Sequence, residues 1–392
     1  MSITKIATAL AMHLGLTTAV EGPHGIGKSE GLAGEFAREA RENNLHLEVV
    51  LGALCESGSD IAGHVVPDRV GDAIISRRTV PAYVQRILAA QAKGQGSLLV
   101  FDEATGIPRS VALGMWRIAL ERVVGETKLP DNCKILLLAN PPETVPGGME
   151  FSMQMANRLV CLQYSKEEAW EDTRTFLRGG KFKSPTLKPM WEETVATERE
   201  MILTFLEVRP DLRYVLPKEG AEVGSHATYR SWFGKAPVIM AGVEATDLAP
   251  SVKEEVKRAL MYGAVGAGPA EEYLRWRQEL DLPAPETVLE HASDFEMPER
   301  LDRQYAMLAS VVSYALANMN KEVWTKTWDV IARYCESGKS DIAVVHATNL
   351  VQGESALYER TKKNGGKATR MPSNVKGLLA VLPLVSAIGQ YA

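Results

Sequence analysis

The chain has 392 residues, of which 45% are hydrophobic and 24% are charged, so it is long enough for two or three domains with real cores. A net charge of −5 and a pI of about 5.9 argue against a protein whose main role is to coat nucleic acid. With no signal peptide, no bilayer-length apolar stretch and four scattered cysteines, we expect a cytoplasmic protein with free thiols and no membrane partner.

A glycine-rich loop follows the first predicted strand. We expect a helix over residues 3–14, a strand over 17–20 and a helix from residue 28 to about 43. The loop reads Gly22-Pro23-His24-Gly25-Ile26-Gly27-Lys28-Ser29, with Glu30 behind it. In this P-loop pattern, backbone N–H groups and a helix start face a phosphate chain, Lys28 reaches the β- and γ-phosphates, and Ser29 takes one Mg²⁺ position. On its own, this loop predicts only that a phosphate chain binds here.

A second acidic motif follows a wholly apolar run. After a strand predicted over 47–51 and a hairpin over 65–75, the run at 97–101 has the character of a buried parallel strand and ends in Asp102-Glu103. This is the Walker B pattern, in which Asp102 would hold Mg²⁺ through water and Glu103 would orient and polarise the attacking water. The alternative is that both acids merely favour the start of the next helix.

The next buried strand also ends in a polar residue. A helix over 110–123 and a hairpin-like turn over 123–129 lead to a strand over 134–139, which ends in Asn140 ahead of two prolines. Asn140 could contact both the γ-phosphate and the lytic water, or it could be only a turn former. A fifth strand over 160–164 completes an alternation of strands and helices that predicts a parallel α/β sheet, with ligands at the carboxyl ends of the strands.

The remainder of the chain is predicted to be mostly helical. A capping box at Ser165 opens this part, and Trp170, Phe176 and Leu177 suit the buried side of its first helix. Apolar periods over 305–316 and 324–335 indicate core-facing helices, and the basic stretch 359–372 indicates a loop. The predicted domains are an α/β nucleotide-binding core over 1–164, a helical lid over 165–285 and a helical extension over 286–392.

These motifs, in this order, resemble those of AAA+ ATPases, and within them the MoxR-like group, over about residues 1–280. The resemblance implies a five-stranded parallel sheet of order 5-1-4-3-2 with an α-helical lid. It implies that Asn140 is sensor 1, that Arg158 in Ala-Asn-Arg-Leu is the arginine finger, and that Arg230 in Thr-Tyr-Arg-Ser-Trp is the sensor-2 arginine. Tyr229 stands where the family usually has proline. The hairpins at 65–75 and 123–129 are similar to the helix-2 insert and the pre-sensor-1 hairpin, which project toward a central pore in the family.

The two arginines have different expected roles. A γ-phosphate in hydrolysis needs positive charge delivered to its oxygens. Arg158 lies past the Asn140 strand and would act on the ATP of a neighbouring subunit, whereas Arg230 would act within its own subunit and couple the lid to the nucleotide. Alternatively, Arg158 is a surface residue that caps a helix, and Arg230 stacks on Trp232 or Tyr229.

The sequence therefore predicts a Mg²⁺-dependent ATP hydrolase that forms a homo-oligomeric ring, expected to be a hexamer. The resemblance implies remodelling of a protein client or partner complex, often with a von Willebrand A-type partner. Two alternatives stay open: a nucleic-acid motor or loader, which would use Arg69, Arg77 and Arg78 against the opposing Asp68 and Asp72, and an ATP-dependent scaffold that does not hydrolyse.

Overall fold

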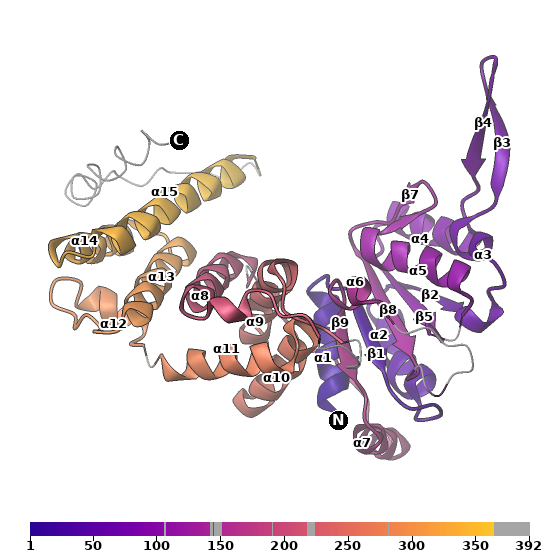
Figure 1. Ribbon diagram of the computed structural model, residues 1–392, viewed down its shortest axis with the longest axis horizontal. Coiled ribbons are helices and arrows are strands. Elements are labelled where there is room, and N and C mark those ends of the chain that lie inside the picture. Colours follow the sequence, from indigo (N-terminus) through magenta and orange to yellow (C-terminus); the bar gives the residue numbers. More distant parts are fainter. Residues whose placement is uncertain are drawn as a thin grey trace. The chain divides into compact units, whose positions relative to one another are not determined.

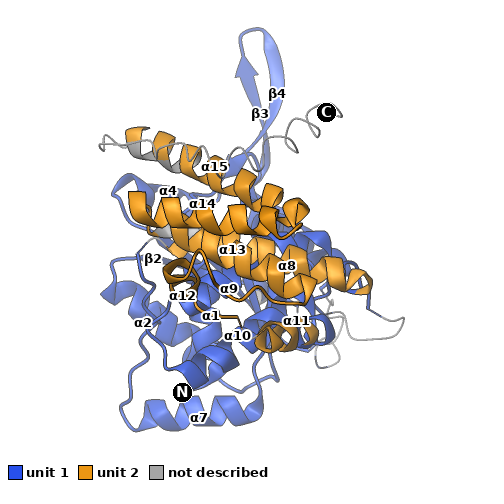
Figure 2. Ribbon diagram, turned by 90° about the vertical axis from the view of Figure 1, so that its left-hand side faces the viewer, with its two compact units in different colours: residues 1–189, 212–271 blue, residues 190–211, 272–392 orange. Residues whose placement is uncertain are grey.

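The computed structural model describes residues 1–105, 107–141, 144, 151–189, 191–217, 224–280 and 282–363. The chain forms two compact units, drawn in different colours in Figure 2. Unit 1 comprises Met1–Pro189 with Leu212–Glu271, and unit 2 comprises Met190–Asp211 with Glu272–Ala392. This grouping crosses the predicted boundaries after residues 164 and 285, so the three-part division stays a prediction. Most of the predicted basic loop at 359–372 lies outside the described residues.

Unit 1 is built on a five-stranded parallel sheet. Its strands are β1 (Thr18–Glu21), β2 (His46–Leu51), β5 (Ser97–Asp102), β8 (Cys133–Ala139) and β9 (Val160–Gln163). They lie in the order β2-β5-β8-β1-β9, which is 5-1-4-3-2 when these five strands are numbered along the chain. Strands β5 and β8 are central and apolar, as the runs SLLVF and ILLLA require of strands covered on both faces. The predicted five-stranded parallel α/β sheet of this order, followed by helices, is confirmed.

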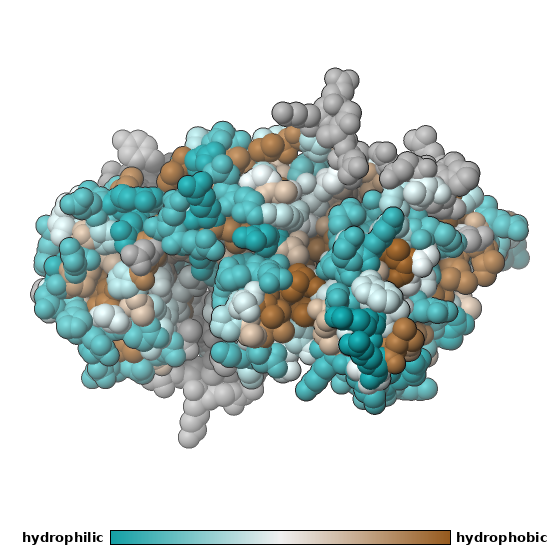
Figure 3. Space-filling view, turned by 90° about the horizontal axis from the view of Figure 1, so that it is seen from below, coloured by the Kyte–Doolittle hydropathy of each residue, from teal (hydrophilic) through white to brown (hydrophobic). Residues whose placement is uncertain are grey.

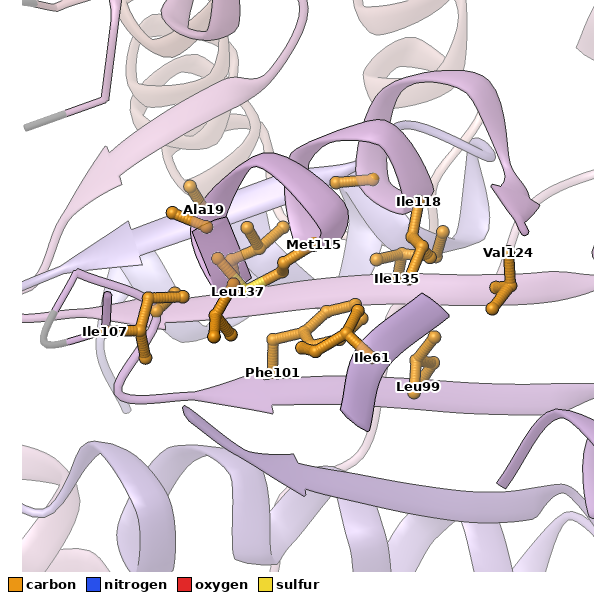
Figure 4. Close-up of a cluster of buried hydrophobic side chains, with 14 of the residues drawn as sticks. Ala19, Ile61, Leu99, Phe101, Ile107, Met115, Ile118, Val124, Ile135 and Leu137 are labelled. Carbon is orange, nitrogen blue, oxygen red and sulfur yellow. The ribbon is translucent and has the colours of Figure 1, made fainter. Parts of the chain in front are cut away.

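Helices cover both faces of this sheet. One face packs against α3 (Gly58–Ala62), α4 (Ala82–Ala92) and α5 (Arg109–Glu121), which bury the apolar cluster in Figure 4 around Phe101 and Leu137. Burial of such side chains stabilises the fold by about 1.5–3 kcal/mol each. The other face contacts α1 (Ile3–His13) and α2 (Gly34–Glu42). Packing of these helices therefore holds in place the carboxyl ends of the strands, where the candidate functional site lies.

Two predicted hairpins are present, and one predicted helix begins differently. The hairpin β3–β4 (Val65–Val70, Ala73–Arg78) projects from the body of unit 1 in Figure 1, and β6–β7 (Val123–Val124, Thr127–Lys128) is the second. The helix expected from residue 28 starts as a π-helix, η1 (Lys28–Ala33), because the Gly27 carbonyl accepts from both Gly31 N (2.7 Å) and Leu32 N (3.2 Å). π-helical turns are often found at functional sites.

The prediction that Trp170, Phe176 and Leu177 face the core is wrong. In α7 (Lys166–Leu177) these side chains are 61%, 61% and 74% exposed. The helix packs instead through the buried Asp172, which accepts hydrogen bonds from Ser2 N (2.8 Å), Ser2 Oγ (2.5 Å) and Tyr164 Oη (3.0 Å). A buried carboxylate needs hydrogen-bond donors, and this requirement determines which face of α7 points inward. The capping box between Ser165 and Glu168 is present, as predicted.

The remaining elements of unit 1 are helical or short turns. They are η2 (Gly52–Leu54), α6 (Met153–Ala156), η6 (Ser231–Lys235), α9 (Ala236–Glu244) and α10 (Pro250–Val265). The face drawn in Figure 3 is mainly hydrophilic, with hydrophobic residues in separate patches. None of the described helices is long and apolar enough to cross a bilayer. All four cysteines are free, as predicted; Cys55 and Cys133 are buried, whereas Cys161 and Cys335 are only partly buried.

Unit 2 is a helical bundle with its own core. Its elements are η4 (Trp191–Thr194), α8 (Val195–Val208), η5 (Pro210–Leu212), the end of α11 (Ala267–Glu279), α12 (Pro285–Glu290), α13 (Leu301–Ala317), α14 (Lys321–Glu336) and α15 (Ser340–Lys363). Helix α13 packs against α8, α14 and α15. Trp324, Trp328 and Ile331 lie in the core, which confirms the predicted apolar period.

One buried polar ring of unit 2 predicts a pH-dependent stability. His346 in α15 is 2% exposed, and neither ring nitrogen has a hydrogen-bond partner among the described residues. Burial lowers the pKa of His346 to about 4, whereas an unfolded histidine titrates near 6.5. Below pH 6.5 His346 is protonated in the unfolded chain but stays neutral in the folded chain. The free energy of unfolding should therefore fall as the pH falls toward 4, by about 2 kcal/mol at pH 5.

This prediction is checked by urea unfolding at pH 7.5 and pH 5.0. Burial also lowers the pKa of His13 to about 4, so the His346→Leu variant should lose about half of the difference between the two pH values. His291→Leu, at an exposed histidine, is the matched control and should retain it. Equal pH dependence of the His346→Leu variant and the wild type would contradict the assignment.

Candidate active site

Nine predicted site residues line one cavity at the carboxyl edge of the sheet. The cavity has a volume of about 310 Å³, and we call it the P-loop pocket. Its lining consists of His24, Gly25, Gly27, Lys28, Ser29, Glu30, Asp102, Glu103 and Asn140. The loop after β1, the end of β5 and the residue after β8 supply these side chains, since the carboxyl ends of neighbouring parallel strands meet there.

The glycines of the loop have specific geometric roles. Gly25 and Gly27 have φ values of +76° and +89°, in the left-handed region that other residues avoid. At Gly22 the constraint is space, because a Cβ atom there would lie 2.5 Å from the Tyr164 carbonyl oxygen. The loop is therefore pinned against the end of β9 and curls into the turn that precedes Lys28.

Lys28 is the cationic centre of the P-loop pocket. Its ammonium donates to the carbonyl oxygens of Gly22 (2.6 Å) and Pro23 (2.8 Å) and to Asn140 Oδ1 (2.7 Å). Burial lowers the pKa of Lys28 from its ordinary value, while the negative charges of Asp102 and Glu21 oppose the shift. The lysine thus joins the P-loop to Asn140 at the end of β8.

The Asp102-Glu103 pair has an unusual backbone. Glu103 has a φ of +56°, which costs a residue with a Cβ atom about 1–2 kcal/mol, and its N–H donates to Asp102 Oδ1 (2.9 Å). Gly52, after β2, packs so closely that a Cβ atom there would lie 2.7 Å from the Glu103 carbonyl oxygen. Strained residues of this kind cluster at active sites. The Gly52 contact was not evident from the sequence.

Thr105 is a further site residue that the sequence did not reveal. It is 1% exposed, and its Oγ1 donates to the Asn140 carbonyl (2.9 Å) and accepts from the Asn140 N–H (3.1 Å). The Ala104 N–H also donates to the Leu138 carbonyl (2.8 Å). The loop carrying Glu103 and the residue Asn140 are therefore locked together. A threonine three residues after an aspartate has no distinctive pattern, so only the fold shows this link.

The donor set of the P-loop pocket suits a magnesium ion. Ser29 and Asp102 line the same cavity, and a hydroxyl and a carboxylate are oxygen ligands that Mg²⁺ prefers. With only two protein oxygens, the remaining positions fall to water and phosphate, as is usual for Mg²⁺ in such sites. Among the described residues, no cluster of three or more His, Cys, Asp or Glu side chains forms an all-protein metal site.

A second cavity adjoins the other side of the P-loop. This α7 pocket, of about 490 Å³, shares Gly25, Gly27 and Glu30 with the P-loop pocket. Its remaining lining residues are Ile26, Gly31, Lys166, Ala169, Trp170, Thr173, Phe176 and Leu177. The aromatic residues of α7 that were expected in the core thus form the wall of a cavity beside the P-loop. One loop separates a polar, phosphate-sized space from an apolar one.

Arg158 and Arg230 do not line the P-loop pocket. Both side chains are exposed, and neither makes a hydrogen bond or ion pair with another described residue. Arg158 follows α6, and Arg230 directly precedes the π-helix η6. Their predicted roles as arginine finger and sensor 2 stay predictions.

Comparison with known proteins leaves the family open. No family model and no curated protein matches the chain. Among solved structures, a mutant RuvB from Thermotoga maritima is similar at 13% identity over 73% of this chain and 75% of that chain, with a TM-score of 0.25. NtrX from Brucella abortus is similar at 14% identity over 86% and 64%, with a TM-score of 0.25. AMPPCP-bound DnaA from Aquifex aeolicus is similar at 13% identity over 96% and 91%, with a TM-score of 0.18. Similarity at this level adds nothing to what the sheet and the pocket show.

Proposed function

We propose that the protein is a Mg²⁺-dependent ATP hydrolase of the AAA+ class. The observation that carries this proposal is the P-loop pocket, which gathers Lys28, Ser29, Asp102, Glu103 and Asn140 at one edge of a sheet of order 5-1-4-3-2. A lysine, a hydroxyl and two acids around a loop of backbone N–H groups are the parts that phosphoryl transfer to water requires.

Each residue has a distinct task in this proposal. The N–H groups of the P-loop and Lys28 bind the phosphates, and Lys28 exchanges its carbonyl partners for phosphate oxygens. Ser29 and Asp102 would hold Mg²⁺, which supplies positive charge to the phosphate oxygens when bound. Glu103 accepts a hydrogen bond from the attacking water and orients it, and Asn140 holds the opposite side of that water. Thr105 keeps Asn140 and the Glu103 loop at a fixed separation.

We assign the base of the nucleotide to the α7 pocket. The two cavities share the loop that would carry the phosphates, so a nucleotide seated in the P-loop pocket extends past Gly25 and Gly27 toward Trp170. An exposed indole in an apolar cavity offers a face on which a base can stack.

The assembly is proposed to be a homo-oligomeric ring, with six subunits as the expected number. Arg158 is exposed and does not line the pocket of its own chain, so it is free to complete a neighbour's site. Arg230 would act on the nucleotide of its own subunit. The hexamer, the MoxR-like subgroup and a von Willebrand A-type partner rest on the resemblance of the motifs alone.

The projecting β3–β4 hairpin favours a protein client over nucleic acid. Its exposed apolar residues include Val65, Val70 and Ile74, and Arg77 is paired with Asp68 at 3.2 Å. A nucleic-acid motor would use unpaired basic or aromatic residues there, and among the described arginines of the hairpin only Arg69 is exposed without an ion pair or side-chain hydrogen bond. We propose that the ring remodels or assembles a protein complex; ATPase stimulation by DNA that weakens with salt would instead support a nucleic-acid motor.

Lys28→Met tests the proposed activity. The substitution keeps the length of the side chain and removes the charge, so both nucleotide binding and turnover should fall by at least about 100-fold. The measurements are phosphate release and the affinity for a fluorescent ATP analogue. Lys128→Met, at an exposed lysine of β7, is the control and should behave as wild type. A wild type that binds ATP without turnover above background would favour the non-hydrolysing scaffold.

Trp170→Ala tests the placement of the base. Loss of one stacking surface should raise the KM for ATP about tenfold with kcat within about threefold, because base stacking contributes about 1–3 kcal/mol. Tyr214, with a comparably exposed ring at 57%, lies outside the pocket, and Tyr214→Ala should leave KM unchanged. An unchanged KM in the Trp170→Ala variant would place the base elsewhere.

A further inference from the structure

A third cavity of unit 1 lies at the opposite edge of the sheet. It has a volume of about 730 Å³ and shares no lining residue with the P-loop pocket or the α7 pocket. Helices α1 and α2, the starts of β5 and β8, and residues 181–187 enclose it. At about 3.3 Å per residue, β8 separates Lys134 in this cavity from Asn140 in the P-loop pocket by about 20 Å.

The floor of this cavity is apolar and rigid. Phe36 and Phe182 are 3% and 4% exposed and meet edge to face, with ring centroids 5.5 Å apart and planes inclined at 71°. Leu98 and Met12 are buried beside them. The apolar floor is therefore preformed, and its two rings cover mainly each other.

The acidic groups in the wall already have partners. Glu39 accepts from Ser184 N (2.8 Å) and Ser184 Oγ (2.5 Å). The guanidinium of Arg38 is held by Glu35 and by Glu42, the latter at 3.1 Å. Arg38 thus occupies Glu35 and Glu42, whereas the Ser184 donors are uncharged and Glu39 still acts on Lys134 through its charge.

Three lysines around the cavity remain without an ion pair to a described residue. Lys134 is half-buried in β8, and burial lowers its pKa to about 8 although Glu39 opposes the shift. Lys181 and Lys183 are exposed at the rim, where Lys183 acts on Asp247 through its charge. His13 also lines the cavity. Three ammonium groups thus surround a cavity in which Glu39 is the one lining carboxylate without an ion pair to a described residue, and a bound anion would reduce this excess of positive charge.

We infer that this cavity binds a small anion with an apolar body, such as an aromatic carboxylate, with the charged group at Lys134 and the body against the apolar part of the lining. The volume lies in the range of small-molecule sites. The site is separate from the nucleotide, so it suits an effector. Binding of the anion would not require ATP hydrolysis, so this inference does not depend on the proposed function.

Anilinonaphthalene sulfonate, an aromatic anion whose fluorescence rises in apolar surroundings, is a direct probe. With the full chain saturated with ADP, we expect one bound probe per chain. Lys134→Met should weaken binding about tenfold or more, and the Lys181→Met/Lys183→Met double variant, at exposed positions that cannot disturb the core, by about threefold. Lys128→Met is the control.

Phenylnaphthylamine, which lacks the sulfonate, separates charge recognition from apolar binding. It should bind more weakly than the sulfonate and equally well to wild type and Lys134→Met. Sulfonate binding that is unchanged in both lysine variants, or that responds equally to Lys128→Met, would overturn the assignment. Loss of binding in Lys134→Met alone, with an altered melting temperature and an unaffected double variant, would count against it as well.

A second, independent observation concerns the two exposed arginines. The Thr228 hydroxyl donates to Asn157 Oδ1 (2.7 Å), and the buried Lys235 ammonium donates to the Leu159 carbonyl (2.7 Å). Asn157 and Leu159 flank Arg158, whereas Thr228 and Lys235 flank Arg230. Two hydrogen bonds, which we call the clamp, therefore fasten the residues on either side of Arg158 to the segment 228–235 that carries Arg230.

The geometry points to Thr228 and Lys235 as positioning residues that couple Arg158 to Arg230, an inference that rests on the proposed function. If Arg230 responds to the nucleotide of its own subunit and Arg158 serves the neighbour's site, this clamp transmits the state of one site to the next. Rigid elements joined by hydrogen bonds can carry such coupling when both ends have alternative positions.

Thr228→Val should lower kcat about tenfold with KM within about twofold, and Thr228→Ser, which keeps the hydroxyl, should restore it. In an Arg158→Ala background, Thr228→Val should cause no further loss, because the clamp acts through that arginine. Lys235→Met should show the same pattern. Wild-type kcat in Thr228→Val, or losses that multiply with Arg158→Ala, would overturn the clamp. A wild type that is active but indifferent to Arg158→Ala would instead overturn the proposed ring mechanism.

Discussion

Glu103→Gln should abolish ATP turnover while the protein still binds ATP. The substitution keeps the size of the side chain but removes the carboxylate that accepts a hydrogen bond from the attacking water, and loss of a general base typically costs about 10²–10⁴ in rate. Glu103 lines the P-loop pocket but makes no described bond to Lys28, so the phosphate contacts of the loop should survive. The measurements are phosphate release and the affinity for ATP.

A matched control separates this effect from a general change in charge. Glu126→Gln, at the exposed tip of β6–β7, makes the same chemical change away from the pocket and should leave turnover unchanged. Wild-type turnover in Glu103→Gln would remove Glu103 from the mechanism, and loss of ATP binding would give it a binding role. Because the variant cannot complete the cycle, it should also accumulate the assembled ring with ATP, and the protein retained on that ring identifies the client class.

Much of the fold follows from local patterns in the sequence. The apolar runs that form β5 and β8 could only be strands buried on both faces, and the polar residues at their ends could only meet at one edge. Asp102, Glu103 and Asn140 were predictable for that reason. The P-loop was predictable because its glycines and lysine have a fixed spacing.

Other parts of the site depend on contacts that no short pattern carries. The link between Thr105 and Asn140 joins residues 35 positions apart, and Gly52 is a site residue only because β2 ends beside Glu103. The orientation of α7 was mispredicted because its aromatic residues outweigh Asp172 in any apolar count. In the structure the buried Asp172 needs hydrogen bonds from Ser2 and Tyr164, and satisfying them turns Trp170 outward.

Arg158→Ala should lower turnover about 10³-fold, because an arginine finger contributes about 10³–10⁵ to kcat. ATP binding should change little, since Arg158 does not line the P-loop pocket of its own chain. Arg117→Ala, at an exposed arginine paired with Glu121, is the control. Wild-type turnover would reduce Arg158 to a surface residue.

Mixing Arg158→Ala chains with Glu103→Gln chains in equal amounts tests whether Arg158 acts between subunits. Arg158→Ala chains keep Glu103, and Glu103→Gln chains keep Arg158, so neither variant forms a complete site alone. In a heterologous ring with random mixing, about a quarter of the interfaces would pair an intact Glu103 with a neighbour's intact Arg158, and turnover should return to about that fraction. If Arg158 served the pocket of its own chain, every chain in the mixture would lack one of the two groups, and no activity could return. Recovery on mixing therefore requires a site built from two subunits.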